Sequence, residues 1–139
     1  MSDAQGRLEA LGFGAADAAI LAAHFADAER QGRAGHGLAR IDWLATLPDL
    51  DPAARPERTL AEPGYEHWHG RGALGYLTLE AIVRAQLADP PERSRLVVAT
   101  VAFPTGHLGY WTRRLAKDGG LVAVLTAASP PRLAHPDGG

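Results

Sequence analysis

Residues 96–126, LVVATVAFPTGHLGYWTRRLAKDGGLVAVLT, decide the fold class of this chain. Two apolar runs, 96–102 and 121–126, flank residues 108–117, which predict a helix that ends at Gly119-Gly120. Nearly continuous runs of β-branched and aliphatic residues of this length are typical of buried strands. The order strand, helix, strand therefore predicts an α/β layer.

The residues before this stretch extend the same alternation. The spacing of apolar residues predicts a helix over 73–87, and the segment YEHWH at 65–69 predicts a short strand. Asp89-Pro90-Pro91 separates that helix from the next strand. Because an α/β sheet normally carries more strands than these, we expect the chain to be the front part of a longer protein or a deletion product of one.

The first half of the chain predicts helices. An apolar stripe with helical spacing, which includes His24 and Phe25, covers residues 15–31, and shorter helices are expected over 3–11 and 38–47. We expect an N-terminal helical segment at 1–50, a Pro-rich connector at 51–63 and an incomplete α/β cofactor-binding domain at 64–139.

Composition limits the function classes. The chain has 139 residues, a net charge of −2 and no cysteine. Thiol catalysis, disulfide scaffolds and cysteine-based metal sites are therefore excluded, and near-neutral charge argues against nucleic acid as a partner. The polar start MSDAQGRLEA and the absence of a long apolar run predict a soluble cytoplasmic protein without a membrane partner.

Two motifs favour plain structural roles. Residues 70–75, GRGALG, match G-x-G-x-x-G formally. However, the preceding strand is polar and no acidic residue ends the following strand, so a turn and helix start is the favoured interpretation. His67 and His69 share one face of a strand and could bind a metal, but no convincing further ligand accompanies them, so no metal site is predicted.

Two other motifs carry chemistry. His36 lies between two glycines at the start of a predicted helix, and Arg40 lies one helical turn further on. An arginine can hold a carboxylate while a neighbouring histidine passes a proton, although each alone fits a capping histidine and a solvent-exposed arginine. The loop at 103–109 joins a strand to a helix, where ligands bind in many α/β proteins; a ligand loop and an ordinary turn remain equally open here.

Read together, the segments AERQGRAGHGLARIDWL, GRGALGYLTLEAI and FPTGHLGYWTRRLAKDGGLVAVLTAASPPRLAHPDGG resemble the malate/L-lactate dehydrogenase family that lacks a Rossmann fold. Ureidoglycolate and sulfolactate dehydrogenases and piperideine-2-carboxylate reductases are relatives. The resemblance covers the front part of a family member. It implies an N-terminal helical segment followed by a truncated three-layer α/β/α sheet domain.

The resemblance also implies a reaction. It is NAD- or NADP-dependent hydride transfer to or from a 2-hydroxy or 2-oxo acid or a cyclic imino acid, in a homodimer. His36 matches the histidine that exchanges the substrate proton, and Arg40 matches the arginine that binds the substrate carboxylate. The positions matched to the cofactor-binding turn are Thr105, Gly106, His107, Leu108 and Gly109.

Two departures from the family pattern keep an alternative open. The usual serine before the motif histidine is Gly35 here, and a common loop histidine falls on Pro104, with His107 nearby but out of register. The alternative is a non-catalytic remnant that acts as a binding or dimerisation domain. A zinc protein built on His67 and His69 is a third hypothesis.

Overall fold

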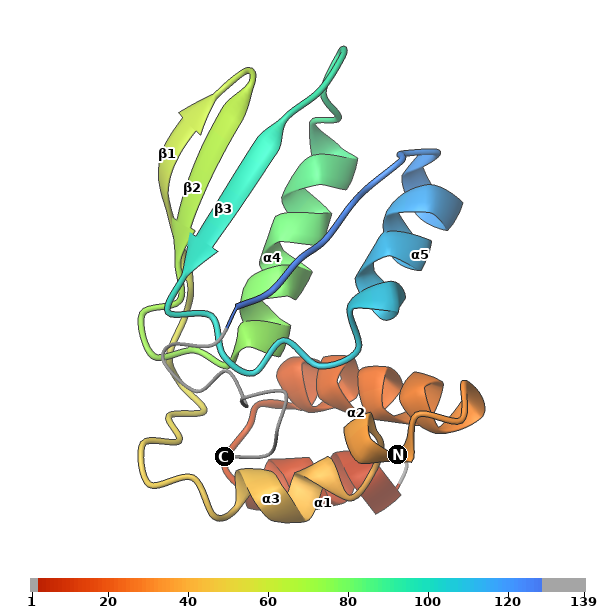
Figure 1. Cartoon of the computed structure of the whole chain (residues 1–139). Coiled ribbons are helices and arrows are strands. Elements are labelled where there is room, and N and C mark those ends of the chain that lie inside the picture. The colour runs from red at the N-terminus through yellow and green to blue at the C-terminus, as the bar shows by residue number, and fades with distance from the viewer. Residues whose placement is uncertain (1–2, 129–139) are drawn as a thin grey trace, which may run out of the picture.

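The computed structural model describes residues 3–128 (Figure 1). The helices are α1 (Asp3–Ala10), α2 (Ala15–Arg30), the short 3-10 helix η1 (Ala34–His36), α3 (Arg40–Leu44), α4 (Gly75–Ala88) and α5 (Leu108–Gly119). The strands are β1 (Glu57–Glu62), β2 (Tyr65–His69) and β3 (Leu96–Thr100).

The three strands form one mixed sheet in the order β1-β2-β3. β1 and β2 are antiparallel and follow each other directly in the chain. β2 and β3 are parallel, with Tyr65 opposite Leu96 and His69 opposite Thr100, and α4 makes the crossover between them. A helical crossover is the ordinary connection between parallel strands, so β2, α4 and β3 are one β-α-β unit.

The helices form two groups. α4 and α5 pack against each other beside the sheet, and α1, α2 and α3 lie together near the carboxyl ends of β2 and β3 (Figure 1). One cluster of buried apolar side chains joins both groups, and its largest members are Phe25, Tyr76 and Trp111. The predicted α/β fold class is confirmed, because helices and a parallel strand pair share one core.

Most predicted elements are present. The predicted helices over 3–11, 15–31, 73–87 and 108–117 correspond to α1, α2, α4 and α5 with small changes at their ends, and the strand at 65–69 is β2. The helix predicted over 38–47 is only the five-residue α3, preceded by η1.

Residues 96–100 form a strand as predicted, but the strand is not buried. β3 ends at Thr100 and lies at the edge of the sheet, so Leu96 is 63% exposed and Val101 is 64% exposed. The polar β2 is the central strand instead, and it is parallel to β3, contrary to the expectation drawn from its polar sequence. It tolerates this position because its buried Glu66 is paired with charged and polar groups.

The strand prediction for 121–126 is also wrong. The segment follows the C-cap of α5 without joining the sheet (Figure 1). Leu121, Ala123 and Leu125 pack on the core, whereas Val122 and Val124 are 100% and 95% exposed. The alternating pattern gives one apolar side, but a strand also needs a hydrogen-bonded neighbour, and none of the described residues provides one.

The connector predicted at 51–63 contains β1, which the sequence did not predict. All six residues of β1 are exposed, so the strand has no apolar face to reveal it. Within residues 3–128, no helix has the length and apolar character needed to cross a bilayer.

Candidate active site

The turn that carries His36 is held by a carboxylate from α2. His36 ends η1, and Glu29 Oε1 accepts a hydrogen bond of 2.9 Å from the backbone N–H of Leu38. A side chain at Gly37 would overlap the Glu29 carboxylate. Gly37 therefore lets the turn lie directly on Glu29, and this contact fixes the position of the His36 turn relative to α2.

Arg40 folds back over the same turn. Its Nε donates a hydrogen bond of 2.7 Å to the carbonyl oxygen of Gly35, and its guanidinium lies 4.9 Å from the centre of the Trp43 ring. No carboxylate of residues 3–128 forms an ion pair with Arg40. The structure thus holds the Arg40 guanidinium against the backbone of the residue before His36, although η1 ends at His36 and α3 begins at Arg40, so the two residues do not share one helix as predicted.

The loop after β3 comes to the same place. The rings of His36 and His107 are stacked with their centres 6.4 Å apart and their planes 23° apart. His107 is the N-cap of α5, so its position depends on the path of residues 101–106. Two residues far apart in sequence therefore form one histidine pair at the carboxyl end of β3.

Three contacts hold this loop. Trp111 Nε1 donates a hydrogen bond of 3.0 Å to the carbonyl oxygen of Thr105, and the backbone N–H of His107 donates one of 3.1 Å to His24 Nε2. Gly106 has φ +67°, and a Cβ there would overlap the rings of His24 and Tyr76. The loop therefore lies on the aromatic core without intervening space.

The charges around the histidine pair favour a neutral His107. Burial lowers the pKa of the His107 imidazole, and Arg113, Arg33 and His36 lower it further, while Asp27 opposes them. Asp27 also forms an ion pair with Arg113, which ties α2 to α5. A neutral imidazole at pH 7 can accept a proton from a bound ligand.

The predicted cofactor positions fulfil structural roles that the sequence did not show. Thr105 and Gly106 contact the core as described, and Leu108 packs against the core cluster. Gly109 faces the side chains of Arg113 and His107. Their role in binding a cofactor stays a prediction. A glycine turn beside a helix N-terminus and an arginine would fit an anionic group of a nucleotide.

The glycines of residues 70–75 have a packing role. A Cβ at Gly70 would overlap the carbonyl oxygen of Val101, and one at Gly75 would overlap those of Ala102 and Pro104. Both glycines thus make room for the segment between β3 and α5, in keeping with the turn and helix start favoured by the sequence.

His67 and His69 lie away from this arrangement. Both are half-buried residues of β2, and His67 Nδ1 is 2.6 Å from the Thr59 hydroxyl. Among the described residues, no group of three His, Cys, Asp or Glu side chains is arranged to hold a metal ion.

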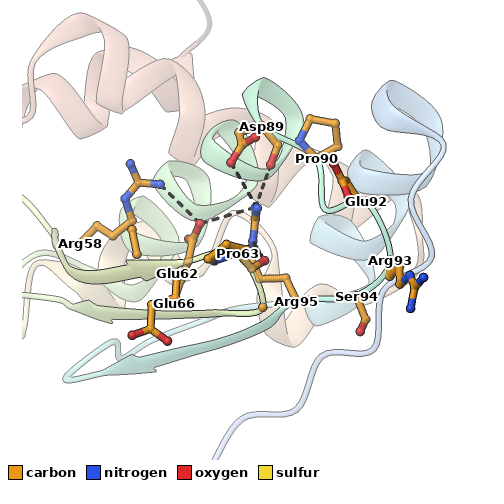
Figure 2. Close-up of a pocket in the computed structure, with 12 residues that line it drawn as sticks. Arg58, Glu62, Pro63, Glu66, Asp89, Pro90, Glu92, Arg93, Ser94 and Arg95 are labelled. Carbon is orange, nitrogen blue, oxygen red and sulfur yellow. Dashed lines mark hydrogen bonds and ion pairs between the residues drawn. The ribbon is translucent and has the colours of Figure 1, made fainter.

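A groove of about 520 Å³ lies at the opposite end of the sheet, by the start of β3 (Figure 2). Arg95 lies against it and pairs with Asp89 at 3.2 Å and with the buried Glu66 at 3.5 Å. Glu66 also accepts hydrogen bonds of 2.9 Å from Trp68 Nε1 and Gln86 Nε2. This network ties β2, α4 and β3 together and includes none of the predicted site residues.

The sequence profile of the family described as malate/L-lactate dehydrogenase matches residues 3–139. The chain belongs to this family of oxidoreductases, as its sequence motifs suggested. No curated protein sequence matches it.

Solved structures share the fold. Sulfolactate dehydrogenase from Methanocaldococcus jannaschii superposes with a TM-score of 0.73 at 20% identity, over 82% of this chain and 34% of its own. Malate dehydrogenase from Pyrococcus horikoshii superposes with a TM-score of 0.73 at 20% identity, over 84% of this chain and 34% of its own. Malate dehydrogenase from Entamoeba histolytica superposes with a TM-score of 0.74 at 16% identity, over 84% of this chain and 34% of its own. The chain thus spans about a third of the length of these proteins.

The family match includes residues 129–139, the SPPRLAHPDGG ending that resembles the family. That ending lies outside the described residues. The His36 motif and the loop after β3 lie within them, and both meet at one place in the fold.

Proposed function

We propose that this chain forms the proton-exchange and carboxylate-binding part of an NAD- or NADP-dependent oxidoreductase. The substrate class is a 2-hydroxy or 2-oxo acid, or a cyclic imino acid. The observation that carries the proposal is the stacking of His36 on His107, with the Arg40 guanidinium bonded to the carbonyl of Gly35, the residue before His36. Oxidation of a 2-hydroxy acid removes a hydride from carbon 2 and a proton from its hydroxyl, so it needs a cation that binds the carboxylate and a base that takes the proton.

The roles follow from the side chains. Arg40 holds the substrate carboxylate through a planar pair of N–H groups, which fixes the neighbouring carbon. His36 takes the hydroxyl proton when a 2-hydroxy acid is oxidised and returns it when a 2-oxo acid is reduced. The nicotinamide cofactor, when bound, accepts or supplies the hydride on that carbon. His107, whose pKa is lowered, stacks its ring beside that of His36.

The test combines binding with turnover. We expect saturable binding of NADH or NADPH, followed by nicotinamide fluorescence, and weak turnover of pyruvate or a cyclic imino acid. Replacement of His36 in His36→Ala should lower kcat by about 10²–10⁴-fold without abolishing cofactor binding, the usual contribution of a general acid or base. Arg40→Lys should chiefly raise KM, because lysine cannot form the two parallel hydrogen bonds.

His67→Ala is the matched control, because His67 lies on the half-exposed face of β2 and bonds to Thr59. It should retain activity. Equal activity of His36→Ala and the unmodified protein would remove His36 from the reaction. Absence of cofactor binding and turnover would favour the alternative, a binding or dimerisation domain without catalysis.

A further inference from the structure

His24 is a fully buried imidazole that the proposed reaction does not use. It lies in the middle of α2 and its exposed fraction is 0%. Four aromatic rings surround it, with centres between 4.7 and 6.0 Å away: Phe25, Tyr76, Tyr110 and Trp111. In such a place an apolar residue would be the ordinary choice, so the imidazole calls for a reason.

Within residues 3–128, the one polar contact of the His24 ring is with the candidate active site. Nε2 of His24 accepts the hydrogen bond of 3.1 Å from the backbone N–H of His107, which is 83 residues further along the chain. A backbone N–H can only donate, so Nε2 carries a lone pair and the neutral ring carries its hydrogen on Nδ1. Nδ1 is buried and has no hydrogen-bond partner among the described residues. Among the described residues, the hydrogen bond to His107 is therefore the one that the His24 ring forms.

The loop leaves no alternative position for this backbone group. Gly106 lies directly on the His24 and Tyr76 rings, in a left-handed conformation, and Trp111 holds the carbonyl oxygen of Thr105. The next residue, His107, begins α5 and stacks on His36. A shift at the His107 nitrogen would thus move the ring that contacts His36.

We propose that His24 is a positioning residue that fixes the backbone of His107 and so holds its ring against His36. This placement stands on the hydrogen bond and the packing. Its consequence for catalysis rests on the proposed function. Asp27 of α2 and Arg113 of α5 are charged groups that act on both His24 and His107, and they are paired with each other.

The matched variants are His24→Gln and His24→Asn. Both replace the ring by an amide, but the Gln Oε1 lies about where Nε2 lies, whereas the Asn oxygen is too short to reach it. We expect hydrogen exchange at the His107 amide to rise at least tenfold in His24→Asn and to stay within about threefold of the unmodified protein in His24→Gln. Exchange at amides in the middle of α4 reports whether either variant has unfolded.

Two further readouts separate positioning from general stability. In the unmodified protein, a scalar coupling across the N–H···N bond should join the His107 backbone nitrogen to His24 Nε2. The ring-proton shifts of His36 should change on His107→Ala, and this change should be lost when His24→Asn is also present. If the oxidoreductase is active, kcat should fall about tenfold in His24→Asn and recover in His24→Gln, with little change in KM.

The outcomes are distinct. No scalar coupling, or equal His107 exchange in the two His24 variants, would overturn the positioning role. Retained coupling and the Gln–Asn difference without any turnover would support the positioning role and refute the proposed function. Since the coupling is measured on the unmodified protein, the proposal stays testable even where a variant fails to fold.

Discussion

At the scale of one residue, the burial of His24 makes stability depend on pH. Burial, with His107 beside it, lowers the pKa of His24 from 6.5 to about 4. Between these values the unfolded chain binds a proton that the folded protein excludes, so stability is full above pH 6.5 and falls as pH decreases towards 4. The free energy of unfolding that is lost between pH 6.5 and pH 4 is about 3 kcal/mol. Urea unfolding between pH 4 and 7 measures it.

His24→Gln is the control for this prediction, because the amide does not titrate. Its stability should fall less steeply with decreasing pH, while the contribution of His107, whose pKa is also lowered, is retained in both proteins. Identical pH profiles for the two proteins would show that His24 does not carry the effect.

At the scale of one element, the start of α4 depends on the absence of a side chain at Gly75. A Cβ there would overlap the backbone oxygens of Ala102 and Pro104, which cannot rotate away as a side chain can. Gly75→Ala should therefore destabilise the protein by about 3 kcal/mol or more and displace the loop towards His107. Urea unfolding and the His107 amide shift measure the two effects.

Gly6→Ala in α1 is the matched substitution, because no atom lies within 4 Å of the added Cβ. It should stabilise the protein by about 0.5–1 kcal/mol, since alanine favours a helix over glycine. A similar small gain in Gly75→Ala would mean that the loop after β3 does not press on α4.

Elements with an apolar stripe were predictable, and elements defined by their neighbours were not. α2 and α4 carry helical apolar spacing, so their positions follow from the sequence. β1 has six exposed residues and gives no such pattern. Residues 121–126 have a strand-like pattern without a pairing partner among the described residues, because pairing is a property of the neighbouring chain.

The candidate site was predictable in part for the same reason. His36 and Arg40 are only four residues apart, so the sequence places them near each other, although η1 ends at His36 and α3 begins at Arg40 and no continuous helix joins them. The meeting of His36 with His107 depends on the path of the whole β-α-β unit, which spacing does not contain. His24 looked like a member of the α2 apolar stripe, and only its contact with His107 shows a different role.

At the scale of the whole molecule, the exposed apolar surface predicts self-association. Val122 and Val124 are almost fully exposed, and Leu96, Val101 and Phe103 are each more than 60% exposed. Surfaces of this kind, beside an unpaired sheet edge, favour contact with a second copy. We expect the mass measured by sedimentation to rise with concentration. It should rise less in the double variant Val122→Lys/Val124→Lys, with stability changed by no more than about 0.5 kcal/mol.

The alternate residues of the same segment separate association from folding. Leu121 and Leu125 pack on the core, so Leu121→Lys/Leu125→Lys should lower stability, because it removes apolar burial. Together with weaker association of the Val122→Lys/Val124→Lys variant, this loss of stability would place the leucine side of the segment in the monomer's core and the valine side in the contact between copies. A concentration-independent mass for the unmodified protein, or equal association of the Val122→Lys/Val124→Lys variant, would exclude that contact and leave the exposed valines without a role in assembly.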